Sequence, residues 1–195
     1  MATRISLWPH IGTPRGALTG IDVEMARSGC GKIALRFIAF GNIDAVETPV
    51  SPSPGAGRKD GLWRHTCFEA FVRVGECSAY HEFNLAPSGD WACYRFDDYR
   101  QGMTAEQQVG DPRVETRRGL GTLDLPETPF LELSATLELA GAMLPVDAPW
   151  HLGLSAVIEE KGGNKSYWAA KHPPGKPDFH HPDCFALELA AARPA

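Results

Sequence analysis

Apolar and polar residues alternate along several short segments of the chain. In residues 130–139, FLELSATLEL, Leu131 and Leu133 fall on one side of an extended chain, and Glu132 and Glu138 fall on the other. A period of two residues is typical of a β-strand with one buried and one solvated face. The same alternation runs through residues 32–40, 151–160 and 184–189, and residues 18–25 form a further candidate strand near the start.

A hairpin is predicted over residues 79–96, because two apolar-rich runs flank Pro87-Ser88-Gly89-Asp90, whose residue types favour a turn. The sequence also contains 20 Gly and 16 Pro, and no amphipathic helix stands out. About ten strands at short spacing predict an all-β fold, a jelly-roll-like antiparallel β-sandwich. The length of 195 residues fits a single domain over residues 1–195, with residues 48–61 and 97–112 as surface loops.

The segment GLWRHTCFEAFVRV, residues 61–74, places polar residues on a strand that otherwise reads as buried. Phe68, Ala70 and Val72 share one phase and should face the core, so Glu69 and Arg73 should face away from it. The predicted core comprises Leu35, Phe37, Phe68, Ala70, Val72, Phe83, Phe96, Leu133, Leu154 and Leu187.

In the hairpin, we expect Phe83 and Leu85 to face the core together with Ala92, Tyr94 and Phe96. The residues then predicted to face away are Tyr80, Glu82 and Asn84 on one strand and Trp91, Cys93, Arg95 and Asp97 on the next. Two interpretations of this polar face stay open. It is either a recognition surface or an ordinary solvated sheet face that carries cross-strand ion pairs.

The charge pattern excludes several classes of function. The net charge is −5, and the 19 basic residues are scattered rather than clustered, which argues against nucleic-acid binding. No segment is apolar over the length of a membrane span, and the first residues lack the apolar core of a signal peptide. Five cysteines without CxxC pairs favour reduced thiols, and hence a cytoplasmic protein.

No metal or cofactor is expected from the sequence. The segment HPPGKPDFHHPDC offers His172, His180, His181, Asp183 and Cys184, a composition that can bind a metal ion. However, adjacent His180 and His181 would point to different sides of an extended chain. The segment is therefore better interpreted as a Pro-stiffened surface loop. No P-loop, dinucleotide fingerprint or serine nucleophile elbow occurs.

Three features together resemble the DOMON-like proteins, which are bacterial relatives of the family 9 carbohydrate-binding modules. Trp63 precedes Glu69 by six residues, a Tyr-x-Glu-Phe-Asn strand begins at Tyr80, and Pro87-x-Gly89 leads into an aromatic-rich return strand. A late Trp168 before a Pro/Gly-rich loop also fits the pattern. The resemblance implies a jelly-roll β-sandwich, in agreement with the alternation.

The resemblance also implies a binding site. Family 9 modules hold a sugar between two Trp side chains, while Glu and Arg bind its hydroxyls. The matching positions are Trp63, Glu69, Arg95 and Trp168, with Arg73 as an alternative to Arg95. Glu82 and Asn84, on the predicted polar face, complete the set of candidate ligand-binding residues.

The Trp-to-Glu spacing constrains the shape of such a site. Six residues of ideal strand span about 20 Å, at roughly 3.3 Å per residue, which is too far for one monosaccharide. Trp63 should therefore lie on a loop that folds back over the strand, and Gly61 is suited to the bend.

The interpretation that follows is a non-catalytic domain that binds a small ligand, a saccharide, in a cleft lined by Trp, Glu and Arg. Three alternatives remain. The first is a haem-binding DOMON-type domain that uses Met103 with His81 or His65. The second is a glycan-processing enzyme that uses Glu69 and Glu82. The third is a module whose partner is another protein chain.

Overall fold

The computed structural model describes residues 2–14, 16–28, 31–49, 54–121, 127–142 and 144–191. The strands in the first half of the chain are β1 (Thr3–Pro9), β2 (Leu18–Arg27), β3 (Lys32–Gly41), β4 (Cys67–Val74), β5 (Tyr80–Leu85) and β6 (Trp91–Phe96). Those in the second half are β7 (Thr104–Ala105), β8 (Gly110–Leu120), β9 (Pro129–Glu138), β10 (Trp150–Glu159), β11 (Lys165–Ala169) and β12 (Leu187–Leu189). Four single 3-10 turns join them: η1 (Ile43–Ala45), η2 (Leu62–Arg64), η3 (Ala140–Ala142) and η4 (Pro182–Cys184). None of these described turns is long or apolar enough to cross a membrane.

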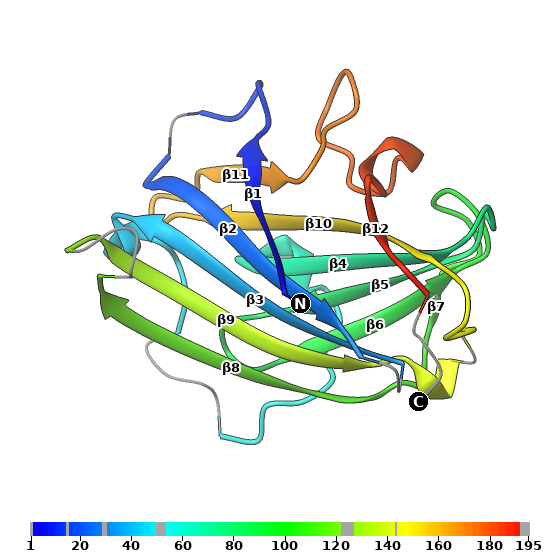
Figure 1. Ribbon diagram of the computed structural model, residues 1–195. Coiled ribbons are helices and arrows are strands. Elements are labelled where there is room, and N and C mark those ends of the chain that lie inside the picture. The colour runs from blue at the N-terminus through cyan, green and yellow to red at the C-terminus, as the bar shows by residue number, and fades with distance from the viewer. Residues whose placement is uncertain are drawn as a thin grey trace.

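The strands form one curled antiparallel sheet that folds into two facing layers (Figure 1). The order is β7-β6-β5-β4-β10-β11-β1-β2-β3-β9-β8, and β12 pairs with the free end of β10. Strand β1 joins the layers, because Thr3–Leu7 pair with β2 whereas Trp8 and Pro9 pair with β11. The predicted all-β sandwich is therefore confirmed.

The main core lies between the two layers and follows the alternation in the sequence. Phe37 on β3 and Phe68 on β4 meet across the layers, with ring centroids 5.1 Å apart. The residues of the predicted core that are buried there are Leu35, Phe37, Phe68, Ala70, Val72, Phe83, Leu133 and Leu154. Leu187 packs against the same cluster and is partly buried.

The prediction that Ala92, Tyr94 and Phe96 of the second hairpin strand face the core is wrong. Leu85 pairs directly with Trp91, and Phe83 pairs with Cys93. Because directly paired residues share a face of the sheet, Trp91 and Cys93 face the core. Phe96 pairs with Tyr80 and lies on the opposite face. The five residues between Leu85 and Trp91, closed by a hydrogen bond from Ala86 N to Asp90 O of 2.9 Å, set this register.

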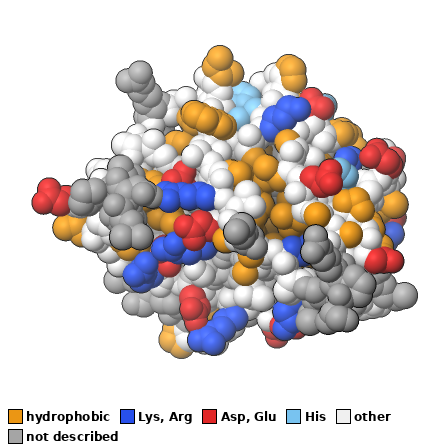
Figure 2. Space-filling model, in the orientation of Figure 1, with side chains coloured by type: hydrophobic (Ala, Val, Ile, Leu, Met, Phe, Trp, Pro, Cys, Tyr) orange, Lys and Arg blue, Asp and Glu red, His pale blue; other side chains and the backbone are white. Residues whose placement is uncertain are grey.

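The outer face of the layer formed by β2, β3, β9 and β8 is solvated. Arg36 on β3 pairs with Glu24 at 3.0 Å and with Glu132 at 2.6 Å, and Arg117 on β8 also pairs with Glu132. Figure 2 shows basic and acidic side chains mixed over this face. Such exposed pairs add little stability each. Apart from Ile38, Phe40 and Phe130, which form a small buried cluster on this face, the layer has the division between a buried and a wet face that alternation implies.

Two strands lie where the sequence shows weak or no alternation. Strand β1 covers Thr3–Pro9, and β8 covers Gly110–Leu120. Of the predicted surface loops, residues 97–112 contain the two-residue strand β7 and the start of β8. Residues 48–49 and 54–61 form the described part of the other loop, which touches the sheet through a bridge between Arg58 and Trp91.

Candidate ligand-binding cleft

The outer face of the other layer, made by β6, β5, β4, β10 and β11, is covered instead of solvated. Glu69, Glu82 and Asn84 point to this face, yet their exposed fractions are 2%, 5% and 0%. A second hydrophobic cluster builds up here from the sheet residues Phe71, Tyr80, Tyr94, Phe96 and Val157 and the covering residues Leu62, Phe179 and Phe185. The interpretation as an ordinary solvated sheet face is therefore wrong for this layer.

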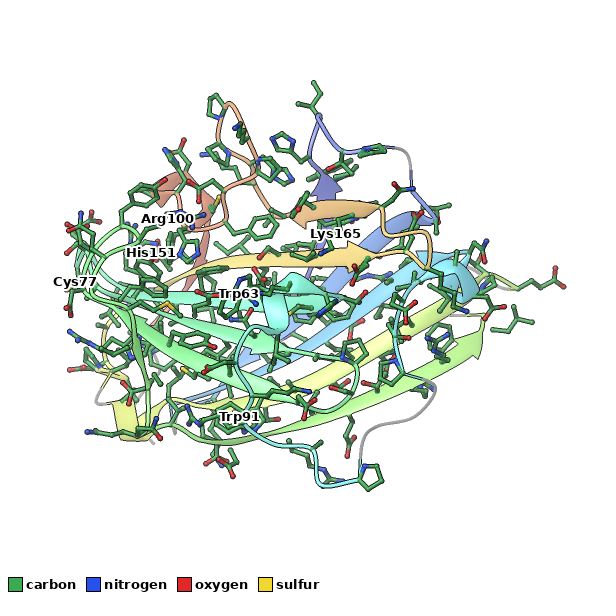
Figure 3. The ribbon with its side chains drawn as sticks, turned by 180° about the vertical axis from the view of Figure 1, so that it is seen from behind. Trp63, Cys77, Trp91, Arg100, His151 and Lys165 are labelled. Carbon is green, nitrogen blue, oxygen red and sulfur yellow. The ribbon has the colours of Figure 1, made fainter. Side chains whose placement is uncertain are left out.

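A cleft of about 410 Å³ opens between the sheet and its covering segments. It is lined by Trp63, Glu69, Glu82, Phe96, Arg100, Met103, Val157, Tyr167, Pro177, Phe179 and His180. Figure 3 shows Trp63 on η2, which lies over β4 and β10, and Arg100 beside the segment that precedes β12. Aromatic rings thus form much of the wall, and two carboxyl groups form the floor. Small-ligand sites commonly combine a mostly apolar lining with a few polar groups in this way.

Trp63 reaches the cleft by a backbone bend. Gly61 has φ 77°, a left-handed conformation that glycine adopts without steric cost, and η2 follows it directly. The Trp63 ring then meets the Tyr94 ring edge-on, with centroids 5.6 Å apart, and keeps 36% of its surface exposed. The bend that the Trp-to-Glu spacing required is present, and Trp63 and Glu69 line one cleft.

The floor of the cleft consists of two glutamates on neighbouring strands. Glu69 pairs with Asn84 in the β4–β5 register, so Glu69 and Glu82 are diagonal neighbours on one face. Ser155 Oγ on β10 donates to Glu69 Oε2 at 3.2 Å, and Asn84 Nδ2 donates to Glu82 Oε1 at 2.7 Å. Cys67 Sγ donates to Asn84 Oδ1 at 3.4 Å. The position of each carboxyl group is therefore set by sheet residues around it.

Burial makes both carboxyl groups weaker acids than exposed glutamates. Desolvation raises the pKa of Glu69 well above its ordinary value, and the nearby Glu82 raises it further. Desolvation also raises the pKa of Glu82 to about 7, although Asn84 and the charge of Arg100 oppose this shift. The pair therefore retains a proton at pH values where exposed glutamates are ionised.

An ion pair joins two of the covering segments. Arg100 Nη2 donates to Asp178 Oδ1 at 2.8 Å, and Tyr99 Oη donates to Asp178 Oδ2 at 2.5 Å. Burial opposes ionisation of Asp178, but these two donors lower its pKa overall. The loop after β6 is thus tied to the loop after β11 beside the cleft.

His180 enters the cleft from the second of these loops. Its Nδ1 lies 2.8 Å from Tyr80 Oη, and its Nε2 lies 3.8 Å from Glu82 Oε2. Burial lowers the pKa of His180 to about 4, so the ring is neutral at physiological pH.

Three of the predicted site residues, Asn84, Trp168 and Arg95, do not line this cleft. Asn84 is fully buried and bonds Glu82. Trp168 pairs with Ala156, is 5% exposed and packs in the main core, with Nε1 donating to Ser166 Oγ at 2.9 Å. The adjacent Tyr167 faces the cleft instead, because successive strand residues point to opposite sides. Arg95 pairs with His81, which places it on the opposite face of the sheet from Glu82, where it bonds Asp97 at 2.6 Å.

Arg73, the alternative to Arg95, does not line the cleft either. Its guanidinium lies 5.0 Å from the Phe185 ring. The arginine that does line the cleft is Arg100, in a loop that has no strand alternation from which its direction could be predicted. His180 and Phe179 belong to the His-rich segment 172–184, and only the packing of that segment on the sheet places them in the cleft.

The suggested haem ligands do not converge. Met103 lines the cleft, whereas His81 lies on the opposite sheet face, 3.4 Å from Glu106. His65 Nδ1 lies 2.6 Å from Glu159 Oε2. Within the described residues no group of three metal-ligating side chains occurs. The residues present therefore do not fit haem ligation through these pairs.

The chain is similar to known structures by fold. No protein-family model matches it, and no curated protein matches it significantly. A candidate carbohydrate-binding protein from Bacteroides uniformis aligns over 94% of this chain and 83% of its own, with 13% identity and a TM-score of 0.65. At this identity the likeness shows a shared fold.

Two further similar structures are family 9 carbohydrate-binding modules from Caldicellulosiruptor kristjanssonii. The one in complex with cellotriose covers 86% of this chain and 72% of its own, with 12% identity and a TM-score of 0.43. The one in complex with glucose covers 87% and 76%, with 11% identity and a TM-score of 0.42.

Proposed function

We propose that this protein is a non-catalytic domain that binds a saccharide in the cleft between Trp63 and Tyr167. The observation that carries the proposal is the convergence of aromatic rings and buried hydrogen-bonding groups in one open cleft. The C–H faces of a pyranose pack on flat rings, and its hydroxyls bind carboxyl and guanidinium groups. In this proposal Trp63, Glu69 and Glu82 contact the ligand, and Asn84 supports Glu82 through its hydrogen bond.

The size of the cleft suits this proposal. A volume of about 410 Å³ falls within the range of small-molecule sites. Arg100 and Tyr167 replace Arg95 and Trp168 as the polar and aromatic partners of Trp63 and Glu69. The likeness to the B. uniformis protein supports a carbohydrate ligand, because that protein is itself a candidate carbohydrate-binding protein.

The experiment that tests the proposal is titration calorimetry with a panel of mono- and disaccharides. Trp63→Ala should weaken binding by roughly 1–3 kcal/mol, because one ring face is lost. Trp8→Ala is the matched control, since Trp8 is 65% exposed and does not line the cleft. Absence of binding at millimolar sugar, or equal losses in both variants, would refute the proposal.

Glycan hydrolysis is the second candidate, because two buried glutamates of unequal pKa recur in glycosidases. Here both carboxyl groups project from one sheet face, so both meet the same side of a ligand. Glycosidase carboxylates instead flank the bond that is broken. Release of reducing sugar from any bound oligosaccharide, abolished by Glu69→Gln, would establish hydrolysis in place of binding alone.

We also propose that the protein works in a reducing compartment, the cytoplasm. Cys67, Cys77, Cys93 and Cys184 have free thiols, and Cys30 lies outside the described residues. Disulfides persist in oxidising compartments and are rare in the cytosol.

A further inference from the structure

We propose that the cleft prefers a saccharide that carries a protonated amine, an amino sugar, whose ammonium group binds to Glu69 and Glu82. This inference rests on the proposed saccharide function and specifies its ligand class. The geometry points to it because two buried acidic side chains form the floor of an aromatic cleft, and no Lys or Arg among the described residues forms an ion pair with either.

Few positive charges surround the two glutamates. Among the described residues that line the cleft, Arg100 is the one with a permanent positive charge. Its guanidinium binds Asp178 at 2.8 Å, and its charge lowers the pKa of both glutamates from a distance without an ion pair to either. His180 is neutral, since burial lowers its pKa to about 4. Within the part of the chain that the structure describes, the floor is therefore an acidic site to which no cationic side chain binds directly.

The remaining ionisable neighbours do not supply a positive charge either. Cys67, beside Glu69 on β4, is fully buried, and desolvation raises its thiol pKa well above the ordinary value. Tyr80, opposite His180, has a pKa raised to about 12 by burial. Both groups are uncharged at neutral pH, so a cation that neutralises the floor has to come from the ligand.

The walls of the cleft are largely aromatic. Trp63, Phe96, Tyr167 and Phe179 surround the cleft, and Met103 contributes a soft sulfur. Aromatic faces attract ammonium groups and disfavour anions. An ammonium between such rings and two carboxylates gains from both, whereas an anionic ligand would be repelled by the floor. The same walls accept the C–H face of a sugar ring, so one ligand satisfies both features.

Binding of an amine changes the protonation of Glu69 and Glu82. Without ligand, Glu69 and Glu82 retain a proton at neutral pH because burial and mutual repulsion disfavour two charges. Binding of an ammonium favours the doubly ionised pair, so a proton leaves the site for solvent when the amino sugar enters. Affinity for the amino sugar should therefore rise as the pH increases toward neutrality. Affinity for a neutral sugar should not, because a neutral ligand does not stabilise the second charge.

The test compares glucosamine, N-acetylglucosamine and glucose by calorimetry at about pH 5.5 and about pH 7, in two buffers of different protonation enthalpy. At the higher pH we expect glucosamine to bind about tenfold more tightly than the two neutral sugars. The buffer dependence should show proton release for glucosamine alone. Glu82→Gln should remove most of the advantage of glucosamine over glucose, together with the proton release on glucosamine binding.

Glu138→Gln is the control variant, since Glu138 is half exposed and pairs with Lys32 away from the cleft. Thermal unfolding of each variant verifies folding, and proton release by the unmodified protein tests the proposal independently of any variant. Equal or tighter binding of glucose or N-acetylglucosamine would overturn the amine preference while saccharide binding stands.

A simple amine separates the two proposals. Cyclohexylamine carries the charge and an apolar ring but no hydroxyl groups. If it binds with proton release while no sugar binds, the ammonium site stands and the saccharide function fails. If neither the amine nor any sugar binds, both proposals fail.

Discussion

The free energy of unfolding should depend on the protonation of Glu82, because burial changes the pKa of this side chain on folding. The pKa of Glu82 is about 7 in the folded protein, against an ordinary value of 4.5. Between these values the folded state holds a proton that the unfolded chain has lost. Stability from this group is therefore present below about pH 4.5 and declines as the pH rises to about 7.

The magnitude follows from the size of the shift. One pKa unit corresponds to about 1.4 kcal/mol, so the penalty for ionised Glu82 reaches about 3 kcal/mol above neutral pH. Glu82→Gln removes the ionisation and keeps the oxygen that accepts from Asn84 Nδ2. Relative to the unmodified protein, the variant should gain about 3 kcal/mol between mildly acidic and mildly alkaline pH.

His180 acts in the opposite direction and has to be separated from this effect. Its pKa is about 4 in the folded protein, against 6.5 ordinarily, so its contribution to stability rises with pH over that range. The contribution is common to the unmodified protein and the variant. The difference between their unfolding free energies, measured by urea denaturation at several pH values, therefore reports Glu82 together with its effect on the coupled Glu69.

Glu138→Gln serves again as the control, because it removes a half-exposed carboxylate that pairs with Lys32 away from the cleft. A pH-independent difference for Glu82→Gln would refute the reasoning, because it would show that Glu82 ionises normally in the folded protein. A loss of stability for Glu82→Gln at alkaline pH would refute it as well.

Three further outcomes are expected. Val72→Ala should destabilise the fold by about 1–3 kcal/mol in denaturant unfolding, because Val72 is fully buried in the main core; a value near zero would contradict that packing. Thiol titration of the denatured, non-reduced protein should find five free groups per chain, matching the five cysteines, and three or fewer would argue against a reducing compartment. Asp178→Asn should speed hydrogen exchange in the loops around Arg100 and His180 by weakening the ion pair between them, and unchanged exchange would show that the pair is dispensable.

Local sequence pattern determined the strands that have one wet and one buried face. The alternation of Leu131, Leu133 and Leu137 with polar residues predicts β9 correctly, because the outer face of its layer meets solvent. The bend at Gly61 was likewise predictable, since the distance from Trp63 to Glu69 along an ideal strand is too long for one site.

The tertiary structure alone decided the phase of β6 and the identity of the cleft residues. In β6 only Arg95 is exposed, because the core covers one face and loops cover the other. Apolar residues therefore occupy both phases, and alternation carries no information about which face is which. Strand β11 is also covered on both faces. Alternation therefore could not show that Tyr167, and not Trp168, faces the cleft.

Arg100 and His180 lie 80 positions apart in the sequence, on loops without periodicity. They meet because Asp178 binds Arg100 and because Phe179 and Phe185 pack on the outer face of the sheet. These contacts join residues that are far apart in the sequence. The direction in which each side chain points is set by packing between elements and not by its neighbours in the chain. The sequence by itself therefore determined the sandwich and the acidic floor, whereas packing of the covering loops decided which side chains complete the cleft.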